Sequence, residues 1–142
     1  MSAVSPSRLT IELNVQAADL DELGHVNNAT YLRYAEEAAR AHSAARGFPL
    51  GAYVALGALP VVRRHEIRYR RPALPGDTLA VTTELRRLDG RRAVRHTDIR
   101  RAADGALLAE ADTEWVWVDG ERGRPVRVPE AVLAAFEVAD GT

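Results

Sequence analysis

Apolar and polar residues alternate with a period of two in five separate stretches of the chain. The stretches cover residues 9–16, 61–70, 78–88, 92–102 and 106–118. In the first, Leu, Ile, Leu and Val at the odd positions alternate with Thr, Glu, Asn and Gln. A period of two is typical of a strand with one buried face, so the pattern predicts five β-strands.

One stretch has a helical period instead. From about Ala29 to Arg46, small and aromatic residues recur every three to four positions, which predicts a long helix. Asn27 or Asn28 can cap its start through a side-chain oxygen. Gly47 provides a normal stop. The apolar face is rich in alanine, so a sheet can approach this helix closely.

Short turns join most of the strands that follow the helix. Asp89–Gly90 and Asp104–Gly105 each lie between two strand-like stretches and predict hairpins. Strands joined by short turns pair antiparallel, so the fold class is α+β. We expect a curved antiparallel sheet of about five strands wrapped around one long helix, with sheet edges that invite a partner subunit. Residues 129–138 predict a short terminal helix.

Length and composition set the class of protein. The 142 residues suit one domain, residues 1–142. No apolar run approaches the roughly 20 residues of a membrane span, and the first ten residues lack a signal-peptide pattern. The chain has no cysteine, which excludes disulfides, thiolate zinc sites and a cysteine nucleophile. We therefore expect a cytoplasmic protein without a membrane partner.

Positive charge is concentrated in one segment. Residues 63–101 hold twelve arginines and five carboxylates, a local charge of +7 in a chain whose net charge is −1. Guanidinium groups pair well with phosphate oxygens, so the segment suits a polyanionic partner. Tyr69 is its only aromatic residue, which is poor material for stacking bases. We therefore predict no nucleic-acid partner, with nucleic-acid binding as the weakest of the alternatives.

The chemistry is concentrated just before the long helix. Asp21 precedes a Gly-His-Val-Asn-Asn turn that leads into the helix. A helix start presents unpaired N–H groups and a partial positive charge, which can stabilise an oxyanion. A carboxylate next to such N–H groups suits acyl transfer, although an ordinary turn-forming aspartate would have the same spacing. For nearby Asp19 we expect a role in stabilising the turn.

Three sequence motifs resemble the hotdog-fold acyl-CoA thioesterases, in particular the 4-hydroxybenzoyl-CoA thioesterase and YbgC-like group. The first motif consists of Asp21, Gly24, His25, Val26, Asn27, Asn28, Tyr31, Glu37 and Ala38. The second covers residues 67–73 and 75–77, and the third residues 118–119 and 124–129. Together they extend over roughly residues 8–132.

The resemblance implies a hotdog fold whose subunits pair into a continuous sheet, as homodimers or homotetramers with interfacial active sites. It implies an acyl-CoA substrate that is hydrolysed to a carboxylic acid and CoA. It also implies that no metal and no other cofactor takes part.

The resemblance assigns catalytic roles to the turn and the helix start. Asp21 matches the catalytic aspartate, acting as nucleophile or general base. At Asn28 the backbone N–H would polarise the thioester carbonyl. Gly24 would let the thioester approach, or adopt a positive φ. For His25 a general base, a residue that orients water and a turn-stabilising residue all remain open.

Other residues are candidates for substrate contacts. Tyr31 would line the acyl pocket or belong to the core. Arg91 and Arg92 follow the Asp89–Gly90 turn, where the resemblance places CoA phosphate contacts; a solvated pair of charges is the alternative. Glu37, like its neighbour Glu36, would carry the reaction only if the chain followed another hotdog branch.

The remaining histidines have no metal-ligand spacing, and we expect His42, His65 and His96 to be structural. The sequence leaves open an acyl-ACP thioesterase, to which His-Val-Asn-Asn is also similar, and a non-catalytic acyl-CoA-binding protein. A hotdog dehydratase is disfavoured because its histidine-bearing motif is not found.

Overall fold

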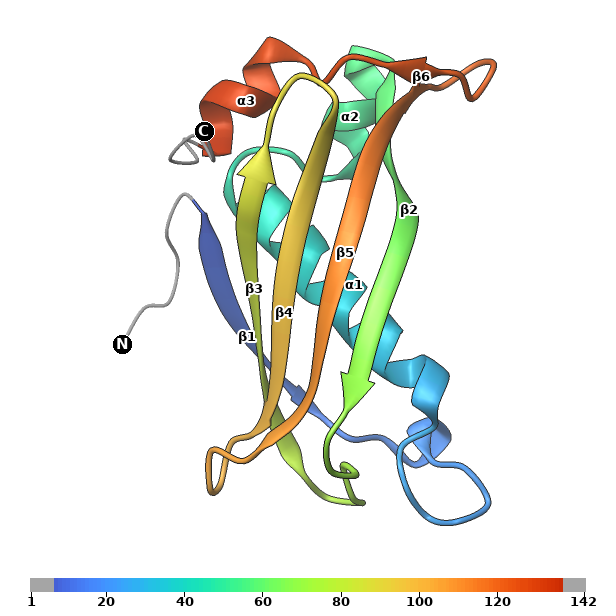
Figure 1. The fold of residues 1–142 in the computed structure, drawn as a ribbon, viewed down its shortest axis with the longest axis vertical. Helices are drawn as coiled ribbons and strands as arrows, with labels where there is room; N and C mark the ends of the chain where they lie inside the picture. The colour runs from blue at the N-terminus through green and yellow to red at the C-terminus, as the bar shows by residue number, and fades with distance from the viewer. Residues whose placement is uncertain (1–6, 137–142) are drawn as a thin grey trace.

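The computed structural model describes residues 7–136 and contains one curved sheet with a long helix packed across it (Figure 1). The strands are β1 (Arg8–Asn14), β2 (Ala58–Tyr69), β3 (Thr78–Leu88), β4 (Arg92–Arg101), β5 (Leu107–Asp119) and β6 (Pro125–Val126). The helices are η1 (Ala17–Asp19), a 3-10 turn, α1 (Asn28–Ala45), α2 (Leu50–Leu56) and α3 (Glu130–Phe136).

All strand pairs in the sheet are antiparallel. The five long strands follow the order β1-β3-β4-β5-β2, and the two-residue β6 pairs with β5. β1 and β2 are therefore the two edges. Register shifts at Val62/Arg64, Leu85/Arg87 and Ile99/Arg100 mark irregularities that help a sheet to curve.

Helix α1 runs diagonally behind the sheet in Figure 1, from the loop before it at the lower end to α2 and α3 at the upper end. Its buried positions include Tyr31, Tyr34, Ala35, Ala38 and His42, which recur at three- and four-residue spacing. Small residues in this stripe let the helix lie close to the strands. The apolar core has two parts, one around Tyr31 and Tyr34 and one around Tyr53 and Trp117.

The predicted architecture is confirmed, and its boundaries are close. β3 has the predicted bounds, and α1 begins one residue earlier than predicted, with Asn27 as its cap. α2 was not predicted from the sequence, and neither were η1 and β6. The predicted terminal helix extends to residue 138, and its last two residues lie outside the described range. No helix within residues 7–136 is long and apolar enough to cross a membrane.

Candidate functional site

A small closed loop holds Asp21 at the start of α1. Leu20 and Val26 form an isolated antiparallel bridge that brings the two ends of the loop together. Inside it, the Asp21 N–H donates to the carbonyl of His25 at 2.8 Å, and the Gly24 N–H donates to the carbonyl of Asp21 at 3.0 Å. The backbone of residues 20–26 is therefore fixed by its own hydrogen bonds.

The two carboxylate oxygens of Asp21 have different environments. Oδ1 accepts hydrogen bonds from the backbone N–H groups of Leu23, at 2.9 Å, and His25, at 3.3 Å. Oδ2 has no hydrogen-bond partner among residues 7–136, and the side chain is partly exposed. One oxygen orients the carboxylate, and the other is available for chemistry.

Asp19 has the structural role expected for it. Its side chain is 3% exposed and accepts hydrogen bonds from the Tyr34 hydroxyl at 2.7 Å, from the Gln16 N–H at 2.9 Å and from Arg33. Burial raises the pKa of Asp19, but these hydrogen bonds and the Arg33 charge outweigh it, so the pKa lies below its ordinary value. Asp19 ties the loop to α1.

The first backbone donors of α1 are only partly satisfied. The Asn27 side chain accepts from the Ala29 N–H at 2.9 Å, and the Asn27 carbonyl accepts from the Thr30 N–H at 2.9 Å. The Asn28 N–H has no acceptor within the part of the chain that the structure describes. It is thus the N–H at the positive end of the helix that remains available to a ligand.

The segment that joins β2 to β3 closes the site from the other side. The Val26 N–H donates to the carbonyl of Ala73 at 3.1 Å, and the Ala73 N–H donates to the Tyr31 hydroxyl at 2.9 Å. Tyr69, at the end of β2, donates to the carbonyl of Asn28 at 2.9 Å. These contacts bring together the first and second sequence motifs.

Tyr31 is a core residue in this structure. It is 2% exposed and packs edge-on against Tyr34 and Tyr69. Burial raises the pKa of its hydroxyl, and the nearby carboxylate of Asp21 adds to the rise. Its position supports the core interpretation over a substrate contact within one chain.

Gly24 and His25 contribute through their backbones. Gly24 has φ of +76°, and a Cβ added there would meet nothing within 4 Å, so the conformation and not the space calls for glycine. His25 is exposed, and its ring has no hydrogen-bond partner among the described residues. Its backbone N–H and carbonyl both bond Asp21, so its observed contacts stabilise the turn.

Arg91 and Arg92 are not near Asp21 within one chain. They lie at the β3–β4 turn, at the opposite end of the sheet from the loop (Figure 1). β4 has ten residues, which correspond to roughly 30 Å. Arg92 is bound to Glu114 at 2.6 Å, whereas the Arg91 side chain has no hydrogen-bond or ion-pair partner among residues 7–136.

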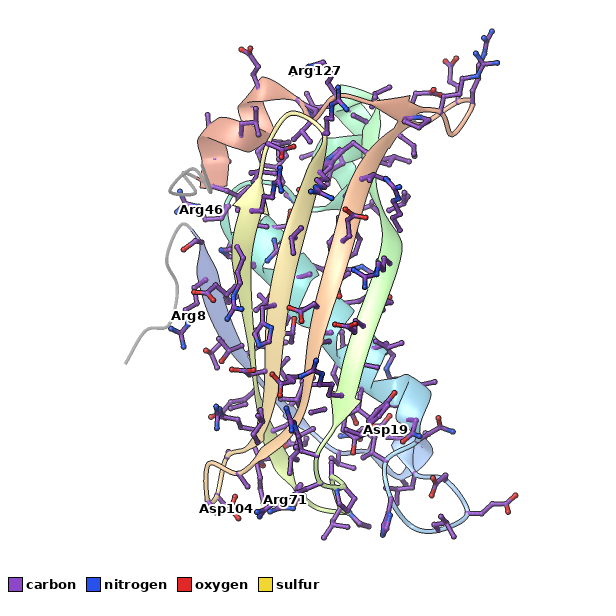
Figure 2. All side chains as sticks on the ribbon, viewed as in Figure 1. Arg8, Asp19, Arg46, Arg71, Asp104 and Arg127 are labelled. Carbon is purple, nitrogen blue, oxygen red and sulfur yellow. The ribbon has the colours of Figure 1, made fainter. Side chains whose placement is uncertain are left out.

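A basic cavity of about 520 Å³ lies at the same turn, and two of its arginines were not predicted from the sequence. Arg63 and Arg127 line it together with Arg91, Gly90 and Trp117. Figure 2 shows Arg127 at this upper end and Asp19 at the lower end. Arg63 and Arg127 are 28 and 36 positions from Arg91 in sequence. Their proximity depends on how β2, β4 and the chain after β5 are aligned in the sheet, which would have to be predicted first.

Much of the positive charge in residues 63–101 is neutralised by carboxylates in the fold. Arg70 binds Glu110 at 2.6 Å, and Arg101 binds both Asp77 and Asp104 at 3.1 Å. Further pairs hold Arg63, Arg64, Arg86, Arg87, Arg92 and Arg100. The local excess in the sequence is therefore not a continuous basic surface.

The remaining histidines have protein partners. His65 Nδ1 lies 2.8 Å from Thr113 Oγ1, and His42 contacts Arg95. On β4 and β5, potential ligand atoms of His96, Asp98 and Glu110 lie within 4.8 Å of one another. His96 already bonds Asp98 and Asp112, and Glu110 bonds Arg70, so the group reads as an ion-pair network.

Comparisons with known proteins place this arrangement in a family. Residues 15–136 match the model of the thioesterase-like superfamily. The long-chain acyl-CoA thioesterase FadM of Escherichia coli K12 is 32% identical over 108 residues, which cover 76% of this chain and 81% of FadM. The acyl-CoA thioester hydrolase YbgC of E. coli O6:H1 is 30% identical over 125 residues, which cover 88% and 92% of the two chains.

Solved structures agree with the sequence comparisons. A probable thioesterase from Bartonella henselae superimposes with a TM-score of 0.80 at 29% identity, over 87% of this chain and all of that one. The chain therefore belongs to the thioesterase-like superfamily. This membership confirms the predicted hotdog fold and, at the level of the family, the predicted enzyme class of thioester hydrolases.

Proposed function

We propose that this protein hydrolyses an acyl-CoA thioester to a carboxylic acid and CoA, with Asp21 and the Asn28 N–H as its reacting groups. The observation that carries the proposal is that both groups lie in residues 20–28, the loop and the start of the helix that follows it. Asp21 is oriented through Oδ1 and keeps Oδ2 available, while the first N–H of α1 lacks an acceptor in the described chain. The acyl-CoA thioesterases among its relatives support the choice of substrate.

The roles follow from the needs of thioester hydrolysis. The carbonyl oxygen would accept from the Asn28 N–H, so that charge developing on this oxygen meets the positive end of α1. Asp21 Oδ2 would either take a proton from the attacking water or attack the carbonyl carbon itself. In the second route water then opens the mixed anhydride. In both, the C–S bond breaks and the CoA thiolate leaves.

A thiol-release assay tests the assignment. With a panel of acyl-CoA substrates, Asp21→Asn should lower kcat by at least about 100-fold, because a general base usually contributes at least that much to the rate. Glu22→Gln is the matched control, because Glu22 is an exposed carboxylate in the same loop. It should keep near wild-type activity. Wild-type turnover by a folded Asp21→Asn variant would overturn the assignment.

Asn28 gives a second, independent check. Its proposed role belongs to the backbone, so Asn28→Ala should reduce kcat much less than Asp21→Asn does. An equal loss would mean that the side chain acts in the reaction. Matched acyl-CoA and acyl-ACP substrates distinguish the two carriers, and saturable acyl-CoA binding without thiol release would indicate a non-catalytic binding protein.

The CoA phosphates would bind at the basic cavity of a second subunit. Arg91, Arg63 and Arg127 line that cavity, but it lies at the far end of the sheet from Asp21. Two-fold antiparallel pairing of two β2 edges would bring the lower end of one chain beside the upper end of the other. A homodimer, or a homotetramer built from it, would then carry interfacial sites.

The surface beside β2 favours such pairing. β2 is a 12-residue edge strand, and exposed apolar side chains lie on it and on α2, namely Leu50, Val54, Leu56 and Val61. A long edge strand with apolar neighbours is a template for another chain. Phosphate contacts through arginine would weaken as salt rises, so KM for acyl-CoA should increase with ionic strength.

A further inference from the structure

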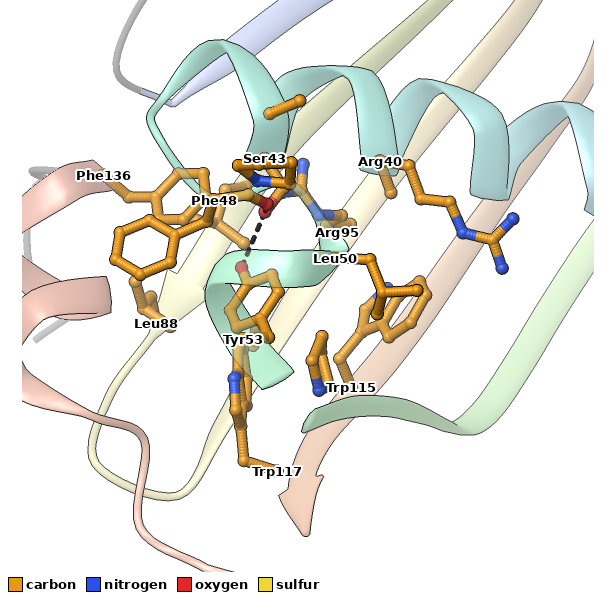
Figure 3. Close-up of a pocket in the computed structure, with 16 residues that line it drawn as sticks. Arg40, Ser43, Phe48, Leu50, Tyr53, Leu88, Arg95, Trp115, Trp117 and Phe136 are labelled. Atoms are coloured by element: carbon orange, nitrogen blue, oxygen red, sulfur yellow. Dashed lines mark hydrogen bonds between the residues drawn. The ribbon is translucent and has the colours of Figure 1, made fainter. Parts of the chain in front are cut away.

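A cavity of about 510 Å³ lies at the other end of α1 from Asp21, between α1, α2 and the sheet (Figure 3). Its walls are mostly apolar and include Phe48, Leu50, Leu85, Leu88, Trp115 and Phe136. Its size falls within the roughly 300–1,000 Å³ of small-ligand sites. Among residues 7–136, no aspartate or glutamate lines it.

A buried cation forms part of this wall. Arg95 on β4 is 6% exposed, and its Nη1 donates to His42 Nδ1 and to Thr83 Oγ1, each at 3.0 Å. Its guanidinium carbon lies 5.7 Å from the centre of the Phe136 ring. A histidine nitrogen that accepts a hydrogen bond is neutral, so none of these three contacts supplies a negative charge.

Most of the donors of Arg95 are unused within the described part of the chain. A guanidinium carries five N–H bonds, and the two hydrogen bonds to His42 and Thr83 use two of them. Within residues 7–136 the other three have no acceptor, and no carboxylate forms an ion pair with Arg95. Burial lowers the pKa of Arg95 to about 10, which still leaves it charged at neutral pH. A buried charge without a counter-charge is costly.

The other polar side chains that residues 7–136 contribute to the cavity wall are hydrogen-bond donors, and none of them is acidic. Ser43 Oγ donates to the carbonyl of Phe48, so in the 2.6 Å contact between Ser43 and Tyr53 the tyrosine hydroxyl is the donor. The indole N–H groups of Trp115 and Trp117 are buried without an acceptor in the described structure. Buried polar groups are normally paired, so within residues 7–136 this end of the molecule offers donors without a matching anionic acceptor.

We propose that this cavity is a binding site for a carboxylate carried on an apolar body, with the Arg95 guanidinium as its anchor. The apolar walls would take the hydrocarbon part, and the unused N–H groups of Arg95 would pair with the carboxylate oxygens. A carboxylate has one negative charge, which matches the one positive charge of the Arg95 guanidinium. A phosphate dianion would leave an uncompensated charge in an apolar cavity.

The carboxylate has two possible sources. It is either that of a free carboxylic acid or a second carboxylate at the far end of the acyl group of a substrate. The second source rests on the proposed thioesterase function, whereas binding of the free acid does not. The cavity is at the opposite end of α1 from Asp21, so in the proposed dimer the cavity of the paired subunit would be the one that faces an acyl group bound at Asp21.

Direct binding tests the site without turnover. Trp115 and Trp117 are the only tryptophans of the chain and both line the cavity, so their fluorescence reports occupancy. We expect a medium-chain fatty acid to bind at least about tenfold more tightly than its primary amide, because only the acid pairs with the cation. Arg95→Gln should remove this preference, and Asp21→Asn should keep it.

Arg40→Gln is the matched control, since Arg40 also lines the cavity but is exposed and pairs with Glu36. It should keep the preference for the acid over the amide, because the proposed anchor is Arg95. If Arg95→Gln does not fold, Arg95→Lys keeps the charge without the planar fork and should still weaken binding of the acid more than of the amide. Equal affinities of wild-type protein for acid and amide would overturn the proposal.

Two further measurements distinguish the occupants. If the carboxylate belongs to the acyl group, kcat/KM is higher for an acyl-CoA with a distal carboxylate than for the plain acyl-CoA, and Arg95→Gln abolishes the difference. If a free acid binds, it inhibits the wild type but not Arg95→Gln. A third outcome is that the wild type does not bind the acid, but a variant with Glu137→Gln and Asp140→Asn does. This would overturn the proposal, because a carboxylate of the chain itself would then be the partner of Arg95.

Discussion

Two aspartates that lie two positions apart in sequence have opposite environments. Asp19 is buried and its oxygens accept three hydrogen bonds, from Gln16, Arg33 and Tyr34. Asp21 is partly exposed, and only Oδ1 is bonded among the described residues. A fully bonded carboxylate is a poor nucleophile and a good anchor, so the first holds the loop in place and the second is suited to react.

Replacement of Asp19 should destabilise the fold mainly above pH 4. Asp19→Asn removes the charge that Arg33 faces and leaves polar groups unmatched, at a cost of about 2–4 kcal/mol at neutral pH. The folded-state pKa of Asp19 is depressed, so its contribution is complete above the unfolded value of about 3.9 and is lost as pH falls through the folded value.

Urea unfolding of both proteins from pH 7 to pH 3 measures this effect. The difference in unfolding free energy between wild type and Asp19→Asn should shrink as the pH falls. Glu22→Gln, which removes an exposed carboxylate from the same loop, should show little difference at any pH. A wild-type advantage that is constant down to pH 3 would contradict the assigned role of Asp19.

Gly24 should matter more for activity than for stability. Gly24→Ala forces a side chain into a backbone with φ of +76°, which costs about 1 kcal/mol and shifts the loop that aims Asp21. Gly105 in the β4–β5 turn has φ of +72° and similarly open space, so Gly105→Ala has the same intrinsic cost far from the proposed site. Thermal unfolding should show similar losses for the two variants, whereas thiol release should fall only in Gly24→Ala.

The sheet carries its own electrostatic network at the level of the strands. His96 on β4 lies between Asp98 on the same strand and Asp112 on β5, at 2.9 and 2.8 Å. Burial lowers the pKa of His96, and Arg86 lowers it further, but the hydrogen bonds to the two carboxylates outweigh both and raise it above its usual value. The protonated histidine therefore joins β4 to β5.

This network should stabilise the protein in acid more than in base. Because the folded-state pKa of His96 is raised, its contribution is complete below the unfolded value of about 6.5 and is lost as pH rises through the folded value. His96→Gln should cost about 1 kcal/mol or less near pH 5 and progressively less toward pH 9. Unfolding of His25→Gln, whose exposed ring lacks a partner in the described chain, should follow the wild type at each pH.

Whether an element could be predicted from the sequence depends on whether its own residues show a clear period or cap. Strand β3 and helix α1 are set by periodicity and local caps, which a sequence displays directly. α2 is seven residues long and contains Gly51 and Ala52, too short and too small for a clear period. Pro49 before it and Gly57 after it, with φ of +74°, were the available signals.

The residues of the candidate site also differ in how far the sequence could predict them. The loop residues Asp21 to Asn28 form a contiguous motif, so the sequence could indicate them together. The Arg95–His42 contact joins residues 53 positions apart, and Arg127 lies against Gly90 although the two are 37 positions apart. Such contacts depend on strand register and on the side of the sheet that α1 covers, which single-sequence patterns do not specify.

At the scale of the whole molecule, the proposed reaction requires two distant ends of the fold. Asp21 lies at the lower end of the sheet and the Arg91 cavity at the upper end, so one chain alone cannot bring the thioester to Asp21 while its own arginines hold the phosphates of the same CoA. In the proposed dimer two paired chains would do so, because a two-fold axis beside β2 would invert one chain relative to the other. The assembly is thus part of the proposed active site.

Mixing two inactive variants tests whether each site contains parts of two chains. Asp21→Asn abolishes the proposed base, and Arg91→Gln combined with Arg127→Gln removes phosphate contacts. In a mixed dimer, one site would combine the intact Asp21 of one chain with the intact arginines of the other, while the second site would carry both defects. Random exchange makes half of the dimers mixed, so activity at low acyl-CoA concentration should return to about a quarter of wild type.

Subunit exchange followed by thiol release measures this recovery of activity, with sedimentation to verify that the variants still associate. If exchanged dimers regained no activity, each site would have to lie within a single chain, which would contradict the proposed interfacial site.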